Sequence, residues 1–134
     1  MKIVDIREKT IRLQGEIANA VVNFSDHTVS LLALISDQIR NGKPVVGFGF
    51  NSIGRYGQGG ILRERMIPRL LRTAEEKLLS DDGSKFDPAA VVRSAMLNEK
   101  PGGHGDRAGA VAALELAVWD LNGKLEDQPG LANH

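Results

Sequence analysis

The stretch RNGKPVVGFGF, from Arg40 to Phe50, decides how the first half of the chain folds. Before it, residues 28–36 read TVSLLALIS, a nearly continuous apolar run that fits a buried strand and a buried helix equally well. Asn41 and Gly42 form the pair that a tight hairpin turn prefers, and the strand-like PVVGFGF follows directly. The sequence therefore predicts an antiparallel hairpin here.

The residues on either side add one strand and a set of helices. Upstream, residues 2–14 read KIVDIREKTIRLQ, and their partly alternating pattern indicates one bulged strand. Downstream, the three-to-four spacing of apolar residues over 61–79 is typical of an amphipathic helix, which Pro68 should kink or interrupt. Asp87, followed by a proline, predicts the N-cap of a second helix that ends near Asn98.

A third helix, predicted from Asp106 or a neighbour to about Leu125, is unusually apolar. Its sequence AGAVAALELAVWDLNGKL (108–125) carries apolar residues around most of its circumference, with Glu115 and Asp120 as the main interruptions. A three-stranded sheet and two other helices cover such a helix only in part, so we expect a large neighbour. The predicted fold class is α+β, a three-stranded antiparallel sheet followed by a bundle of about three helices.

Composition excludes several classes of protein. The 134 residues suit one domain with a true core, and 42% hydrophobic and 25% charged residues are ordinary globular values. Seventeen basic and seventeen acidic residues leave no basic footprint, so we expect no nucleic-acid or membrane partner. The chain has no cysteine, and it shows neither a signal peptide nor an apolar run long enough to span a membrane. We therefore expect a cytoplasmic location.

The glycine-rich stretch FNSIGRYGQGG, Phe50 to Gly60, admits three interpretations. It is a phosphate-cradling loop, a plain connecting turn, or a loop that closes over another ligand. The phosphate signal is weak, because glycines 47, 49 and 54 do not have the G-x-G-x-x-G spacing. Taken alone, these residues favour a connecting loop whose glycines supply positive backbone dihedrals.

Other catalytic patterns are missing from the sequence. The three histidines, at 27, 104 and 134, are too scattered to form a ligand set by spacing. No G-x-S-x-G elbow presents a serine nucleophile, and Asp37 and Asp120 are single carboxylates without an evident partner at helical spacing. The residues alone therefore indicate no catalytic apparatus.

One run of the last helix resembles a known family. AALELAVWDLNGKLEDQP (112–129) is similar to the pattern that marks the passage from the capping domain to the barrel in the mandelate racemase and muconate-lactonizing branch of the enolase superfamily. Residues 117–120, 123–124 and 129 fit that pattern. Two further phrases, VGFGFNSIGRYGQGGILRER (46–65) and NEKPGGHGDRAGAVAALELAVWD (98–120), resemble the D-tartrate dehydratase family. The resemblance covers essentially the whole chain.

The resemblance implies a bidomain enzyme. Residues 1–104 correspond to the amino-terminal capping domain, and 105–134 to the final helix and the start of a linker into a (β/α)8-type barrel that this chain lacks. In such enzymes the barrel holds Mg²⁺ and the groups that abstract the proton α to a carboxylate, after which water is eliminated. We therefore expect the full-length protein to be a magnesium-dependent dehydratase, a lyase, and these 134 residues alone to bind no metal and to be inactive.

The resemblance also implies where substrate binds. Two loops of the cap, here roughly 18–26 and 50–60, line the pocket of the family and exclude water. The substrate-binding candidates carried over by position are Asn19, Asn51, Ser52, Arg55, Tyr56 and Lys100. Each polar contact to a buried carboxylate is worth about 1.5–3 kcal/mol. The implied partners are a small hydroxy-carboxylate substrate, the barrel domain and further copies in a homo-oligomer.

Two alternatives to the cap of a dehydratase stay open from the sequence. One is a noncatalytic stand-alone module that binds small carboxylates or associates with a barrel on another chain. The other is a remnant without activity. An intact mass far above 14.5 kDa favours the dehydratase cap, and a match to that mass favours the stand-alone module.

Overall fold

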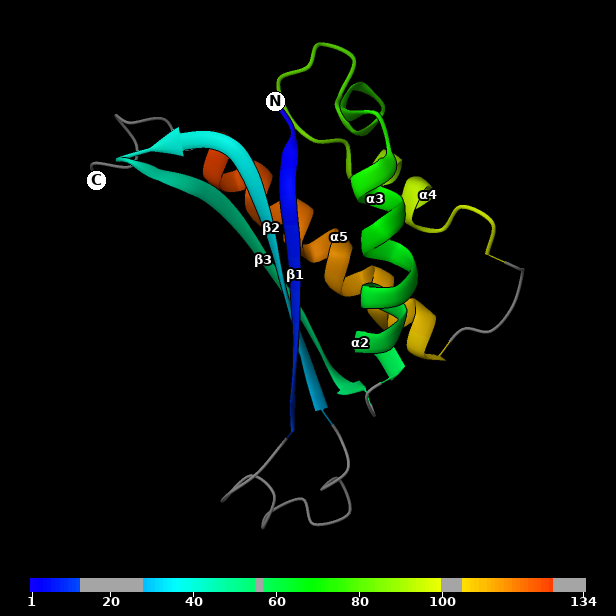
Figure 1. The fold of residues 1–134 in the computed structure, drawn as a ribbon. Coiled ribbons are helices and arrows are strands. Elements are labelled where there is room, and N and C mark those ends of the chain that lie inside the picture. Colours follow the sequence, from blue (N-terminus) through cyan, green and yellow to red (C-terminus); the bar gives the residue numbers. More distant parts are fainter. Residues whose placement is uncertain (13–27, 55–56, 100–104, 127–134) are drawn as a thin grey trace.

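The computed structural model describes residues 1–12, 28–54, 57–99 and 105–126, which form one sheet with helices on one side of it (Figure 1). The predicted α+β fold class is confirmed, with helical segments following a three-stranded sheet in the described residues. The elements are β1 (Ile3–Arg12), β2 (Thr28–Arg40), β3 (Lys43–Gly54), α2 (Gly57–Ile61), a π-helical turn η2 (Leu62–Met66), α3 (Ile67–Arg72), a 3₁₀ turn η3 (Glu75–Leu78), α4 (Pro88–Ala95) and α5 (Gly105–Glu126).

The sheet is antiparallel throughout, in the order β1-β2-β3. The predicted hairpin is confirmed: Asn41 and Gly42 form its turn with φ of 54° and 78°. The predicted bulge in the first strand is also present, between Ile3 and Asp5. The predicted loop over 50–60 is shorter than expected, because β3 continues to Gly54 and α2 begins at Gly57.

The two faces of the sheet differ because side chains alternate along each strand. The inner face supplies the core side chains Ile6, Leu32, Leu34 and Val45. On β3, glycine and phenylalanine alternate, so that Phe48 and Phe50 point outward and are 58% and 59% exposed. The alternating glycines, Gly47 and Gly49, face α5, which crosses behind the sheet (Figure 1).

Close approach of α5 to β3 requires those glycines. A Cβ atom on Gly47 would lie 2.8 Å from the backbone nitrogen of Leu121, and one on Gly49 would lie 2.7 Å from that of Ala117. Both are too close for any side chain. On the α5 side of the contact the residues are also small. Ala113 and Ala117 are both fully buried there, so the helix backbone and the strand backbone nearly touch.

The first helical run departs from the predicted single helix over 61–79. The interruption expected at Pro68 takes the form of the π-helical turn η2 just before it, since proline cannot donate the backbone hydrogen bond and its ring crowds the preceding turn. The helix ends at Arg72, and only the 3₁₀ turn η3 follows. The prediction was therefore too long by about two turns.

The second helix begins as predicted. The carboxylate of Asp87 accepts the backbone N–H of Ala89 at 3.0 Å, and the proline stands at the first helical position. α4 ends at Ala95 rather than Asn98, which adopts a left-handed φ of 67°. The buried Asn122 of α5 then fixes the preceding segment, because its amide bonds both backbone groups of Phe86, at 3.0 and 2.7 Å.

The last helix is confirmed, with one side still uncovered. One stripe of α5, including Leu114, Ala117, Val118 and Leu121, is fully buried against the sheet and α4. On its outer side Leu116 is 44% and Trp119 59% exposed. The described elements thus leave an apolar strip of α5 in solvent, as the excess of apolar residues in its sequence predicts.

The close approach of α5 to β3 predicts that Gly49→Ala lowers the free energy of unfolding by about 1–3 kcal/mol, because the new methyl group overlaps helix backbone. Gly123→Ala is the matched control in α5, where a Cβ meets no atom within 4 Å, and it should raise stability by about 0.5–1 kcal/mol. Urea unfolding of both variants checks this. Equal effects of the two substitutions would contradict the packing described here.

Candidate functional site

The inner face of the sheet turns polar at the end where β1 finishes, β2 begins and β3 finishes. Thr10, Ser30 and Asn51 lie side by side there, one on each strand in register. Ser30 is 1% exposed, and its hydroxyl has no hydrogen-bond partner among the described residues. Buried hydroxyl groups nearly always have a hydrogen-bond partner. The Ser30 hydroxyl, which no described residue binds, therefore distinguishes this end of the sheet from an ordinary apolar core.

A buried carboxylate ties this end to the first helical run. The Glu8 side chain is 0% exposed, and it accepts hydrogen bonds from Thr10 and from the half-exposed guanidinium of Arg63 in η2. Gly59 of α2 lies directly against the group, since a Cβ there would come within 2.8 Å of the Glu8 carboxylate. The cluster therefore fixes where α2 starts relative to β1.

Asn51 ties the same end to α5. Its amide nitrogen donates to the backbone carbonyl of Gly109 at 3.2 Å, in the second turn of that helix. Ser52 follows it on β3. The other predicted substrate-binding residues, Asn19, Arg55, Tyr56 and Lys100, lie outside the described residues, so the full set of six stays a prediction.

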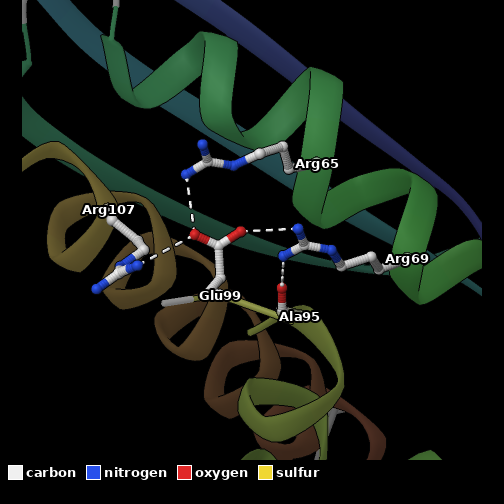
Figure 2. A network of polar contacts seen from close by, with 5 residues as sticks. All are labelled: Arg65, Arg69, Ala95, Glu99 and Arg107. Atoms are coloured by element: carbon white, nitrogen blue, oxygen red, sulfur yellow. Dashed lines mark hydrogen bonds and ion pairs between the residues drawn. The ribbon is translucent and has the colours of Figure 1, made fainter. Parts of the chain in front are cut away.

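Glu99 stands at the centre of a polar network that joins three helices (Figure 2). Its two carboxylate oxygens pair with Arg65 at 3.1 Å, Arg69 at 2.7 Å and Arg107 at 3.2 Å. Arg69 also donates to the carbonyl of Ala95 at 2.7 Å. The hydrogen bond from Arg69 lowers the pKa of Glu99, against the opposing effect of burial, and the other two guanidinium groups add to the lowering.

This network anchors one end of the segment that carries Lys100. Glu99 directly precedes that lysine in the sequence, and its carboxylate is bound from η2, α3 and α5 at once. Sequence reasoning missed Glu99 and its partners, as it missed Glu8 and Arg63. The only available signal was the spacing of Arg65 and Arg69, which places two cations on one face of a helix.

The Trp-Asp-x-x-Gly-Lys motif of α5 has a structural role. The carboxylate of Asp120 accepts the backbone N–H of Phe48 at 2.8 Å, and Lys124 donates to the carbonyl of Val46 at 2.9 Å. The two side chains also pair with each other at 2.9 Å. Burial raises the pKa of Asp120, but the Phe48 N–H and Lys124 outweigh it, so the pKa lies below its usual value. The motif thus binds the free edge of β3.

Residues 1–12, 28–54, 57–99 and 105–126 contain neither a metal-binding cluster nor a membrane-spanning helix. No three His, Cys, Asp or Glu side chains gather there in a way that fits a metal ion, so these residues do not fit a magnesium site. Nor is any helix in that part of the chain long and apolar enough to cross a bilayer.

The burial of Glu8 predicts that Arg63→Met lowers the free energy of unfolding by about 3 kcal/mol, because it leaves a buried charge without its cation. The double variant Glu8→Gln, Arg63→Met should recover most of this loss, because the amide carries no charge. Chemical denaturation of the wild type, Glu8→Gln, Arg63→Met and the double variant measures the coupling. A double variant as unstable as Arg63→Met would show that the carboxylate is not the source of the loss.

The lowered pKa of Glu99 predicts a pH-dependent loss in Glu99→Gln. A carboxylate with a folded pKa below its ordinary value of 4.5 contributes stability above that pH and loses it as the pH falls through the folded pKa. Glu99→Gln should therefore melt below the wild type at neutral pH, and the two curves should converge in acid. Thermal unfolding across pH 7 to about 2 tests this. A difference that is constant across the range would contradict it.

Comparison with known proteins identifies the fold. No protein-family profile matches the chain. Among solved structures, it is similar to a mandelate racemase/muconate lactonizing enzyme-like protein from Rubrobacter xylanophilus, with 18% sequence identity and a TM-score of 0.52. The match covers 98% of this chain but only 32% of that protein, so the chain spans about a third of its length. The sheet and helices described above thus share the fold of about a third of that protein.

Proposed function

We propose that this chain is the capping domain of a magnesium-dependent enzyme of the mandelate racemase and muconate-lactonizing branch, one that removes water from a small hydroxy acid of the tartrate type. Two findings support the proposal. The fold matches a mandelate racemase/muconate lactonizing enzyme-like protein over 98% of the chain. The phrases at 46–65 and 98–120 resemble the D-tartrate dehydratase family.

The observation that carries the proposal is the closeness of the described elements that flank the predicted binding segments. In the sequence, 13–27 lie between β1 and β2, and 55–56 between β3 and α2, and the strand ends next to both segments lie at the polar end of the sheet (Figure 1). Segment 100–104 leads into α5, whose beginning packs against α2 and accepts the bond from Asn51. The candidates Asn19, Arg55, Tyr56 and Lys100 are therefore tied to neighbouring elements, although they are far apart in sequence.

The polar clusters fit the task of a cap. Glu8 with Arg63 joins β1 to the first helical run, and Glu99 with its three arginines fixes the residue before Lys100 against η2, α3 and α5. Binding groups held on rigid elements lose less freedom when substrate arrives, so more of each contact remains as affinity. In this proposal Arg55 and Lys100 pair with the carboxylates of the acid, while the polar amides contact its hydroxyl groups.

The uncovered side of α5 supports a cap rather than a complete protein. Leu116 and Trp119 lie one turn apart in the exposed strip, and Ala112, one turn before Leu116, is also exposed. The solved relative is about three times as long as the matched region, and the further domain of such an enzyme would supply the missing cover. The described residues fit no magnesium site, so in this proposal the metal and the proton-abstracting groups belong to that further domain.

The proposal is tested with the protein as the cell makes it. Its intact mass should far exceed 14.5 kDa, and it should dehydrate D-tartrate when Mg²⁺ is present, whereas residues 1–134 alone should not. In the longer protein, Arg55→Gln and Lys100→Gln should each raise the KM for the acid about tenfold or more, because each removes a charged contact.

The matched control is Lys43→Gln, which removes an exposed charge at the opposite end of the hairpin and should leave KM unchanged. A native mass of 14.5 kDa would favour the stand-alone carboxylate-binding module instead. Turnover by residues 1–134 alone, or an unchanged KM in both variants, would refute the assignment of the cap.

A further inference from the structure

A basic groove lies on the helical side of the domain, between α3, η3 and α4. Its volume is about 490 Å³, which lies within the range of small-molecule sites. Four cationic residues and no acidic residue line it. The lining consists of Arg69, Arg72, Thr73, Ala74, Lys77, Arg93, Ser94, Leu97 and Asn98.

Three of the four cations have no partner in the part of the chain that the structure describes. Arg72, Lys77 and Arg93 are exposed, and none makes an ion pair with a described residue. Arg69 differs, because Glu99 and the Ala95 carbonyl hold its guanidinium in place (Figure 2). Arg69 is therefore held in place on one side of the groove, and three exposed cations line the rest.

The helix ends alone do not account for this charge. Each of the four cations lies in the last turn of α3, η3 or α4, where a positive side chain offsets the negative end of the helix dipole. A helix end carries about −0.5 elementary charge at most, and these helices are short. Three such ends amount to about −1.5 against three unpaired cations, so the groove keeps a positive surplus.

We propose that this groove binds a small molecule through a phosphate group. Cations on three separate elements approach the groove from different sides, which suits the several oxygens of a tetrahedral oxyanion better than a planar carboxylate. The hydroxyl of Ser94 and the amide of Asn98 add neutral polar groups to the lining. The Thr73 hydroxyl already donates to the Arg69 carbonyl at 2.7 Å, so it can only accept.

The groove uses none of the six candidate acid-binding residues. It lies at the end of α3, whereas segments 13–27 and 55–56 adjoin elements at the α2 end of the helical run, and only Lys100 follows the groove closely in the sequence, two residues after Asn98. Arg69 connects the two regions, since it lines the groove and binds Glu99, the residue before Lys100. The inference does not depend on the dehydratase proposal, because it uses other residues and another ligand.

The experiment is calorimetric titration of the chain with sodium pyrophosphate, at about physiological ionic strength so that diffuse charge attraction is screened. We expect saturable binding to one site. The double variant Arg72→Gln, Arg93→Gln should raise the Kd about tenfold or more, because two charged contacts are lost. The control Lys43→Gln, Lys85→Gln removes two exposed charges that do not line the groove and should leave the Kd unchanged.

Two parallel titrations, with inorganic phosphate and with ADP, identify the source of the phosphate. Tighter binding of ADP than of pyrophosphate would indicate a nucleotide, and equal binding would indicate the phosphate group itself. Lys77→Gln serves as a second groove variant should the double variant fold poorly, because Lys77 is exposed at the end of the 3₁₀ turn. No saturable heat with any of the three anions, or equal weakening in the groove and control variants, would overturn the proposal.

Discussion

The contact between α5 and β3 sets the geometry of the whole domain. It exists because Gly47 and Gly49 carry no side chain and Ala113 and Ala117 carry the smallest one, so the two backbones nearly touch. Since side chains alternate along a strand, the same spacing that directs the glycines inward directs Phe48 outward. The approach also brings three polar groups of α5, on Gly109, Asp120 and Lys124, within hydrogen-bond distance of β3.

Two buried or nearly buried carboxylates then fix the helices around this contact. Glu8 joins β1 to the first helical run, and Glu99 joins that run to the beginning of α5. Removing Arg63 would leave the Glu8 carboxylate without its cation, and removing Glu99 would leave three guanidinium groups without their carboxylate. These contacts therefore specify one arrangement of the elements more than they add to net stability. Glu99 directly precedes the segment that carries Lys100, and Glu8 lies on the strand before the segment that carries Asn19, which connects the architecture of the domain to its proposed role as a cap.

Local signals in the sequence predict the elements well and the polar clusters hardly at all. The Asn41-Gly42 turn and the Asp87 cap involve residues within two positions of each other, so they can be recognised from the sequence alone. The end of α3 at Arg72 was missed, because apolar spacing continues beyond it while the chain turns into a 3₁₀ segment. Glu8 and Arg63 are 55 positions apart, and no periodicity pairs them. Only the folded chain brings such partners together, and the same holds for the cations of the basic groove.

The bonds from α5 to the rim of the sheet also bear on the behaviour of the protein in a crowded solution. An edge strand with unpaired backbone amide and carbonyl groups can pair with a strand of another chain, which is a common route to fibrils. Here Asp120 and Lys124 occupy those groups at Phe48 and Val46, and Arg7 and Lys9 place charge along the opposite strand. The helix thereby hinders the addition of another strand at β3. Phe48 and Phe50, on the outer face of the sheet, nevertheless remain exposed to solvent.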